Sequence, residues 1–129
     1  MLPQSLIDKI KDDLVRHEGY VTEIYLCSEG YPTFGIGHMV TEQDMEHTWP
    51  VGTPVTDERI NDVFQTDFNT AYNDACELFH RLDSQPDNVI RVCVNMAFNL
   101  GRPRLKRFRK MIEAVNAHNY NKAADEMVD

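Results

Sequence analysis

The chain has 129 residues, of which 42% are hydrophobic and 26% charged, and these proportions are those of a globular protein. A chain of this length fits one compact domain, or one domain divided into two lobes, and needs no disulfide bonds to fold. Its longest uncharged apolar stretch is far shorter than the ~20 residues of a membrane helix, and its charge-rich start does not predict a secretion signal.

The net charge is −8, and it is unevenly distributed along the chain. Residues 1–101 hold 17 acids against 6 bases, residues 102–110 hold six bases and no acid, and residues 111–129 hold four acids and one lysine. The basic block 102–110 favours a polyanionic partner, unless it is only a solvated helix start. Its one aromatic residue is Phe108 and no nucleic-acid-binding motif accompanies it, so we expect no nucleic-acid partner.

Three cysteines, Cys27, Cys76 and Cys93, form no CxxC pair and cannot all pair within one chain, so we expect reduced thiols. His80 follows Cys76 by four residues, which would place both on one helix face. That pair lacks further ligands, so we predict neither a metal site nor a cofactor.

The first predicted elements are one helix and three short strands. Apolar residues at helical spacing predict an amphipathic helix over residues 4–17. Alternating β-forming residues predict strands over 22–27 and 31–34, joined by a Glu-Gly turn. The Gly-Ile-Gly-His segment 35–38 predicts a third strand, whose glycines indicate a bend or the close approach of another part of the molecule.

The middle of the chain is predicted to be a short helix, a loop and a long helix. Thr41, followed by acids, is a helix-start signal, and the prolines and glycine of residues 49–55 predict a loop. Thr56 is the expected N-cap of a helix of about 25 residues, long enough at ~1.5 Å per residue to join two lobes. Residues 84–87, Ser-Gln-Pro-Asp, predict another helix start.

The last third of the chain is predicted to be helical. Residues 89–100 are apolar on most sides, which is typical of a buried central helix, and Gly101 and Pro103 are expected to stop it. Shorter helices are expected near 105–115 and 119–128. The order of elements therefore predicts an α+β fold in which sheet and helices are segregated.

Residues 17–38, HEGYVTEIYLCSEGYPTFGIGH, hold the most informative side chains. Glu18 stands at a predicted helix–sheet junction, where partial desolvation raises the pKa of a carboxyl group. Cleavage of a glycosidic bond requires such an acid, because the leaving oxygen must receive a proton. Glutamates at helix ends are more often structural or solvated, so Glu18 alone does not identify a glycosidase.

The segment from Glu18 to His38 resembles the amino-terminal lobe of the phage T4-type lysozymes, a family of muramidases. The resemblance includes the spacing from the glutamate to the turn, the EGYPTFGIGH string and the hydrophobic strand before it. It continues in residues 92–101, VCVNMAFNLG, and in residues 120–124, YNKAA, so it covers nearly the whole chain.

The resemblance implies a single lysozyme-like domain with a small three-stranded antiparallel sheet lobe, a long linking helix and a mainly helical lobe. The sheet lobe would span residues 18–55 and the linking helix 56–80. The helical lobe would combine residues 1–17 with 81–129. We expect a monomer.

The resemblance also implies hydrolysis of the β-1,4 bond between N-acetylmuramic acid and N-acetylglucosamine in the glycan strands of peptidoglycan. Glu18 matches the family's general acid, and Thr33 matches the threonine beside the attacking water. Met39 and Phe98 match positions that contact the sugar.

His38 matches a histidine whose role in the family is structural. Its partner there is an aspartate on the long helix, which would be Asp67 in this chain. The resemblance therefore implies an ion pair between His38 and Asp67, and not a catalytic histidine.

The family's second carboxylate stands nine residues after the acid, where this chain has Cys27. A thiol with a reference pKa of about 8.5 is mostly protonated near neutral pH, and Glu23 and Glu29 would raise that pKa if they lie close. A thiolate is nevertheless a strong nucleophile. Cys27 is therefore a working substitute, a weakened group or an inactive one. Glu29 is not expected to replace it, because the family has an acid at this turn alongside the catalytic carboxylate.

A second departure lies at Asp129, where the family continues through further helix that includes an arginine paired with the general acid. Without that cation the pKa of Glu18 would rise further. We expect a phage endolysin that stays in the host cytoplasm until it reaches the cell wall, or one carried by the virion. The alternative function is a lysozyme-like peptidoglycan-binding or scaffold domain that lost turnover at Cys27.

Overall fold

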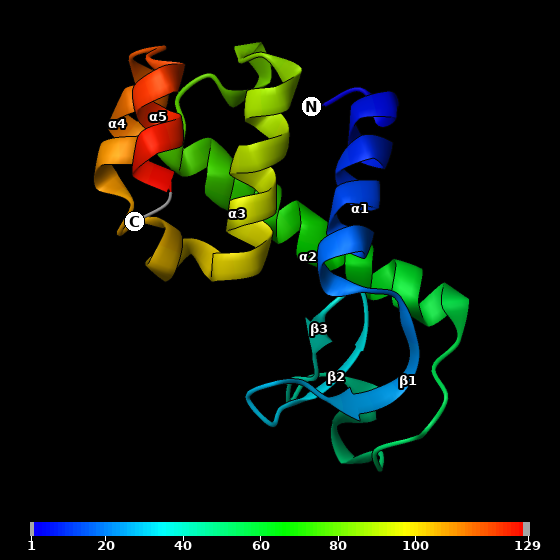
Figure 1. Cartoon of the computed structure of the whole chain (residues 1–129). Helices are drawn as coiled ribbons and strands as arrows, with labels where there is room; N and C mark the ends of the chain where they lie inside the picture. Colours follow the sequence, from blue (N-terminus) through cyan, green and yellow to red (C-terminus); the bar gives the residue numbers. More distant parts are fainter. Residues whose placement is uncertain (1, 128–129) are drawn as a thin grey trace. The chain divides into compact units, whose positions relative to one another are not determined.

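The computed structural model describes residues 2–127. Among these residues the chain forms one helix, then a small sheet, then further helices (Figure 1), which confirms the predicted α+β class. The elements are α1 (Gln4–Glu18), β1 (Val21–Leu26), β2 (Pro32–Gly35), β3 (His38–Met39), η1 (Met45–Thr48), α2 (Asp57–Leu78), η2 (Leu82–Ser84), α3 (Asp87–Leu105), α4 (Arg109–Asn116) and α5 (Tyr120–Met127). No described helix is long and apolar enough to cross a bilayer.

The chain divides into two compact units. We call Lys11–Asp67 the sheet unit, and Met1–Ile10 together with Phe68–Asp129 the helical unit. The boundaries fall inside α1 and α2, so each of these helices contributes residues to both units.

The sheet is antiparallel with the strand order β1-β2-β3. Tyr25 of β1 pairs with Thr33 of β2, and Thr33 pairs with Met39 of β3. Residues directly opposite one another in an antiparallel sheet project to the same face. These three side chains therefore form one row across the sheet.

The outer edge of β1 is covered by the loop that leads to α2. The N–H of Ile24 donates to the carbonyl of Thr53 at 3.0 Å, and the N–H of Gly52 donates to the carbonyl of Ile24 at 2.7 Å. The N–H of Val55 donates to the carbonyl of Thr22 at 2.8 Å. This loop therefore pairs with β1 although it is too irregular to form a strand.

Two predictions for the sheet unit are wrong, namely the position of the third strand and the α-helix at Thr41. The third strand is confined to His38–Met39, because Gly35 ends β2 and Gly37 has a φ of 64° in the turn that follows. No α-helix begins at Thr41. The carboxylate of Asp44 accepts the Thr41 N–H at 2.9 Å, which turns the chain before the short 3₁₀ helix Met45–Thr48.

The long helix begins as predicted. The hydroxyl of Thr56 accepts the N–H of Arg59 at 3.2 Å, so Thr56 is the N-cap of α2. The buried apolar side chains of the sheet unit come from both helices, the sheet and the loop. They are Leu14, Ile24, Phe34, Ile36, Val55, Ile60, Val63 and Phe64.

The helical unit follows the prediction at Gly101. This residue, with φ 72° and ψ 162°, is not helical, so it ends the first helical run of α3, and a second, short run continues after the kink to Leu105. Pro103 is tolerated because it lies in the first turn after the kink, where its missing N–H has no helical partner to lose. Ser84 belongs to the 3₁₀ turn η2, and the N-cap of α3 is Pro86.

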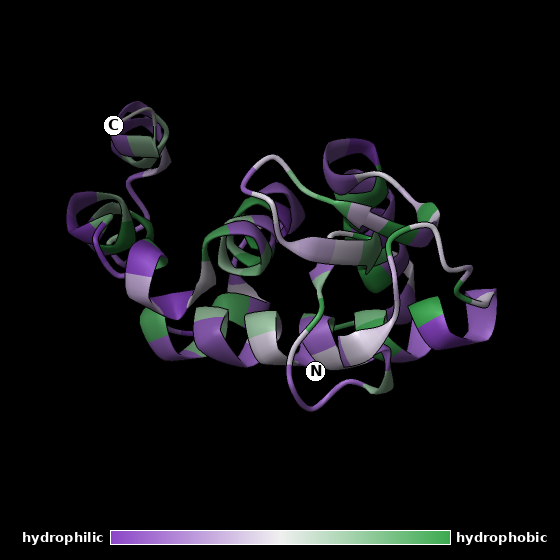
Figure 2. Ribbon diagram, turned by 90° about the horizontal axis from the view of Figure 1, so that it is seen from below, coloured by the Kyte–Doolittle hydropathy of each residue, from purple (hydrophilic) through white to green (hydrophobic). Residues whose placement is uncertain are grey.

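The last two helices, α4 and α5, lie side by side (Figure 1). The expected end of the last helix at residue 128 lies outside the described residues. Figure 2 shows purple and green stretches alternating along the helical ribbons, as amphipathic helices require. The larger buried side chains of the helical unit are Leu2, Leu6, Ile10, Phe68, Phe79, Leu82, Ile90, Val94, Leu105, Met111 and Val115.

Candidate active site

Glu18 is the last residue of α1, and the chain turns sharply after it. Gly19 adopts a φ of 83°, and its N–H donates to the carbonyl of Val15 at 2.8 Å. A glycine in this left-handed conformation is the usual end of a helix. The turn leads directly into β1 and leaves the Glu18 side chain at the junction of helix and sheet.

The carboxyl group of Glu18 lies against the turn between β2 and β3. A Cβ atom placed on Gly37 would be 2.6 Å from Oε2 of Glu18, so only a glycine leaves room for this side chain. The contact removes water from the carboxylate, and burial raises the pKa of Glu18. The charge of His17 acts in the opposite direction but does not cancel this effect.

Cys27 follows β1 in a tight loop. Its N–H donates to the carbonyl of Tyr31 at 2.9 Å, and its carbonyl accepts the N–H of Gly30 at 2.8 Å. This loop directs backbone N–H groups at the sulfur. Hydrogen bonds from the backbone of Tyr31 and Glu29 lower the pKa of the Cys27 thiol, and a hydrogen bond from Thr33 acts in the same direction.

The expectation that neighbouring acids raise the pKa of Cys27 is therefore wrong in its net direction. The carboxylate of Glu29 does act as expected, and so does burial. The backbone donors outweigh both effects because they contact the sulfur directly. These backbone donors could not be predicted from the sequence, since any residue except proline supplies such an N–H.

Thr33 is buried, with 2% of its surface exposed. Its hydroxyl lies 2.9 Å from the carbonyl oxygen of Tyr31 and also reaches the sulfur of Cys27. The single hydroxyl proton can go to only one acceptor at a time. When Cys27 is a thiolate the proton goes to the sulfur, and when it is a thiol the proton goes to the carbonyl.

Tyr25 is a site residue that the sequence analysis missed. Burial raises the pKa of Tyr25, and the charges of Glu18 and Cys27 raise it further. Its hydroxyl is therefore within electrostatic range of both groups. The sequence could have indicated Tyr25, because side chains two residues apart on a strand project to the same face and Tyr25 lies two residues before Cys27. Met39, at the other end of the same row, is 54% exposed.

His38 lies between two carboxylates. Its Nδ1 is 2.7 Å from Oδ2 of Asp67, and its Nε2 is 2.8 Å from Oδ2 of Asp44. Burial alone would lower the pKa of His38, but the hydrogen bonds and charges of the two aspartates raise it overall. Asp67 was the expected partner. Asp44 was not anticipated, because nothing in the local pattern shows that the loop folds back to the ring.

The same network extends to the start of α2. Arg59 donates through Nε and Nη2 to the two carboxylate oxygens of Glu46, at 2.8 and 3.0 Å, and through Nη2 to Asp44 at 3.3 Å. Glu46 is buried, with 1% of its surface exposed. Both nitrogen atoms of His38 are thus engaged by a fixed set of carboxylates, which suits a structural side chain and not a proton carrier.

The remaining predicted residue, Phe98, lies on α3 in the helical unit and is half-buried. The three cysteines are free thiols, of which Cys27 is partly exposed, Cys76 exposed and Cys93 buried. Within residues 2–127 no group of three or more histidine, cysteine, aspartate or glutamate side chains is arranged to hold a metal ion.

The sheet unit thus contains two ionisable groups whose pKa values are shifted in opposite directions. Glu18 tends to keep its proton, since burial raises its pKa. Cys27 tends to lose its proton, since backbone donors stabilise the thiolate. A pair of this kind can protonate a leaving group on one side and place a negative charge on the other.

Comparison with known proteins gives a consistent result. The model of the phage lysozyme family matches residues 15–129. Probable T4-type lysozyme 2 of Dictyostelium discoideum is 24% identical over 144 residues, a region that covers 95% of this chain and 83% of that protein. Peptidoglycan hydrolase gp36 of Pseudomonas phage phiKMV is 29% identical over 119 residues, covering 92% of this chain and 13% of its own length. The pre-baseplate central spike protein Gp5 of Enterobacteria phage T4 is 27% identical over 128 residues, covering 85% of this chain and 22% of its own.

Proposed function

This chain belongs to the phage lysozyme family, and from that membership we propose that it is a muramidase that hydrolyses the β-1,4 bond between N-acetylmuramic acid and N-acetylglucosamine. The substrate is the glycan strand of peptidoglycan. The observation that carries the proposal is the Glu18 carboxyl group packed against Gly37, where burial raises its pKa, in the same compact unit as Cys27, whose pKa is lowered by backbone hydrogen bonds.

In the proposed reaction Glu18 is the general acid. Its proton passes to the glycosidic oxygen as the bond from that oxygen to the anomeric carbon breaks. The raised pKa keeps the carboxyl group protonated closer to neutral pH than an exposed glutamate would be. The contact with Gly37 supports this role because the backbone of the turn packs against the carboxyl group and excludes water from that side.

Cys27 is the second group in this proposal. Its thiolate faces the positive charge that develops on the sugar and accepts a proton from the attacking water. The oxygen of that water bonds to the anomeric carbon while the other proton stays on the new hydroxyl. Thr33, whose hydroxyl reaches the sulfur, orients the water. The hydrogen bonds that lower the pKa also reduce the nucleophilicity of the sulfur, which favours water as the attacking group.

Met39 and Phe98 are the proposed sugar contacts. Met39 is exposed on β3 opposite Thr33, where its flexible side chain is free to pack on a sugar ring. Phe98 adds an aromatic surface from α3. His38 and Asp67 hold the sheet and take no part in proton transfer, because both ring nitrogens are already engaged.

We propose that the chain acts in the lysis of a bacterial host by a phage, and that it stays in the host cytoplasm until its release to the cell wall. The names of two relatives support a phage setting, since one is a hydrolase of a Pseudomonas phage and the other a spike protein of phage T4. The spike protein makes a virion-borne location the competing arrangement. Fractionation of infected cells and purified virions distinguishes the two.

The decisive experiment is the loss of turbidity of permeabilised Gram-negative cells. Wild type is expected to clear the suspension, and Glu18→Gln is expected to be inactive, since it keeps the shape of the side chain and removes the transferable proton. If wild type is inert while it still binds isolated peptidoglycan, the chain is a binding or scaffold domain and the proposal fails.

The stereochemistry tests the role of Cys27 separately. Attack by water inverts the configuration at the anomeric carbon, whereas a covalent sulfur intermediate retains it. We expect inversion in a proton NMR spectrum recorded early in the reaction. Retention would overturn the water mechanism while leaving the muramidase activity itself intact.

A further inference from the structure

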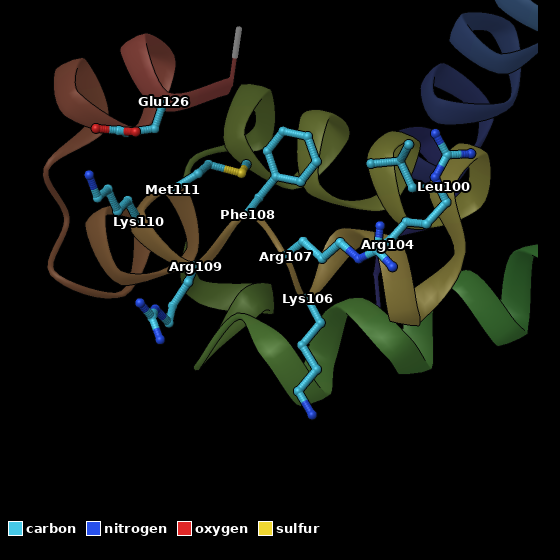
Figure 3. A pocket seen from close by; sticks show the side chains of 9 residues that line it. All are labelled: Leu100, Arg104, Lys106, Arg107, Phe108, Arg109, Lys110, Met111 and Glu126. Carbon is cyan, nitrogen blue, oxygen red and sulfur yellow. The ribbon is translucent and has the colours of Figure 1, made fainter. Parts of the chain in front are cut away.

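The helical unit contains a strongly basic hollow whose position in the fold is independent of Glu18 and Cys27. It has a volume of about 630 Å³ and is formed where α3 ends and α4 begins, with one residue from α5 (Figure 3). The lining residues are Leu100, Arg104, Lys106, Arg107, Phe108, Arg109, Lys110, Met111 and Glu126. We call this set the basic hollow.

Five of the nine lining residues are cationic and one is acidic. Within residues 2–127, none of these five cationic side chains forms an ion pair or a side-chain hydrogen bond. The sixth cation of the same sequence block behaves differently, because Arg102 is paired with Glu77 at 2.7 Å and does not line the hollow. The hollow therefore concentrates positive charge that the protein does not neutralise.

The position of these cations opposes the stability of α4. Arg109 and Lys110 occupy its first turn, which contains no acidic residue, and the N-cap Phe108 provides no side-chain acceptor. Cations at the positive end of a helix are unfavourable. Five neighbouring cations also repel one another. A bound anion would relieve both effects at once.

The hollow also has an apolar part. Figure 3 shows Phe108 in the middle of the lining residues, with Lys110, Met111 and Glu126 on one side and Leu100, Arg104 and Arg107 on the other. Met111 is buried and Phe108 and Leu100 are half-buried, so the ring and the aliphatic side chains form a fixed surface beside the guanidinium groups. Pockets that bind organic ligands combine an apolar surface with a few charged groups in this way.

We propose that the basic hollow is a binding site for a ligand that carries two neighbouring phosphoryl groups. Its lining has a formal charge of +4, from five cations and Glu126. Each phosphomonoester carries about −1.5 to −2 near neutral pH, so two such groups match this charge, whereas a single carboxylate does not. Three of the cations are arginines, whose planar forks bind phosphate oxygens in pairs.

Isothermal titration with sodium pyrophosphate at low salt tests the proposal. Wild type is expected to bind, and Arg104→Gln/Arg107→Gln is expected to bind at least about tenfold more weakly, because two charge-assisted contacts are lost. Affinity should also fall steeply between 50 and 200 mM salt. NMR spectra should show shifts at Phe108 and Met111 on addition of pyrophosphate.

The control is Arg102→Gln/Lys122→Gln, which removes the same net charge from the helical unit but leaves the lining of the hollow intact. It is expected to bind pyrophosphate within about twofold of wild type. Equal weakening in both double variants, or no binding by wild type, would overturn the proposal. Circular dichroism checks that all three proteins are folded.

Two further probes identify the source of the phosphoryl groups. Vesicles of phosphatidylcholine with one tenth diacylglycerol pyrophosphate, a lipid with two neighbouring phosphoryl groups, test a lipid headgroup, and pure phosphatidylcholine vesicles are their control. Binding to the first vesicles alone supports the proposal with a membrane lipid as ligand. Binding of pyrophosphate without vesicles supports it with a soluble phosphate. A twelve-nucleotide single strand that binds tenfold tighter than pyrophosphate contradicts it, because the site would then recognise a nucleic acid.

Discussion

The two compact units of this chain use charge in opposite ways. The sheet unit holds 12 acids and 3 bases, and three of these acids, Asp44, Glu46 and Asp67, are hydrogen-bonded to His38 or Arg59. The helical unit holds 9 acids and 10 bases, and five of its bases line the basic hollow without ion-pair partners among the described residues. The net charge of the chain therefore describes neither unit. Both units have an apolar core, and the sheet unit adds to its core a network of carboxylates around His38 and Arg59.

The largest effect is expected at the sulfur of the sheet unit. Cys27→Ala should reduce the lytic rate by about 10²–10³-fold, because it removes the group that accepts the proton of water. Cys27→Asp should restore activity to within about tenfold of wild type, since a carboxylate can accept the same backbone N–H groups. Turbidity assays measure both variants.

The matched control is Cys76→Ala, which removes an exposed thiol from the helical unit and should leave the rate unchanged. If Cys27→Ala is as active as wild type, the thiol takes no part in the reaction, and the proposed role of Cys27 as the second catalytic group is wrong.

The second prediction concerns the apolar core of the helical unit. Phe79 is fully buried, so Phe79→Ala should lower the free energy of unfolding by about 4 kcal/mol. This loss should not change between pH 5 and pH 8, because a phenyl ring carries no titrating group. Urea unfolding at several pH values measures it. Phe79→Leu should cost much less, and an equal cost would mean that Phe79 is not packed as described.

The third prediction is the pH dependence that the polar network gives to the sheet unit. His38→Gln should lower the free energy of unfolding by about 3 kcal/mol in mildly acidic solution, since it removes the charge-assisted hydrogen bonds that His38 makes with Asp44 and Asp67. The raised pKa of His38 means that its stabilising effect is complete below the ordinary value of 6.5 and disappears as the pH rises through the folded-state value.

The lower limit of this range is set by Asp44. Burial would raise the pKa of Asp44, but the Thr41 N–H and His38 lower it overall, so its contribution is present above the ordinary value of 3.8 and lost as the pH falls. Wild type and His38→Gln should therefore differ most between about pH 4 and pH 6.5. The exposed His47 provides the control, since His47→Gln should show no such dependence. A pH-independent difference at His38 would contradict the network.

The smallest effect is expected at Gly37, where two variants separate backbone strain from contact with Glu18. Gly30→Ala introduces strain alone, because its φ is 85° and nothing lies near its Cβ position, and should cost about 1 kcal/mol. Gly37→Ala should cost about 2 kcal/mol and also reduce the lytic rate, since the new methyl group displaces the Glu18 carboxyl. Thermal unfolding and turbidity assays measure the two quantities. Equal lytic rates in the two variants would mean that the contact does not position the acid.

Much of the fold could be predicted from local patterns. The spacing of Leu6, Ile10 and Leu14 predicts α1, and Thr56 marks the start of α2. Gly101 ends the central helical run as predicted, but the short helical run that follows it and ends at the buried Leu105 was not predicted.

The site could be predicted only where a side chain supplies the chemistry. Glu18, Cys27 and Thr33 were predicted because their residue types and spacing resemble a family motif, and the hydroxyl of Thr33 reaches the sulfur of Cys27. The backbone donors to Cys27 and the fold-back of Asp44 could not be found in this way. Both depend on loop geometry, which any of several residue types would permit.

The loop paired along the outer edge of β1 has a consequence for how copies of this protein meet. An edge strand with free N–H and C=O groups is a template on which another chain can add a strand and begin to aggregate. Here residues 52–55 already occupy that side, and Pro54 has no N–H to offer outward. The loop therefore protects a sheet of only three strands from intermolecular association at high concentration.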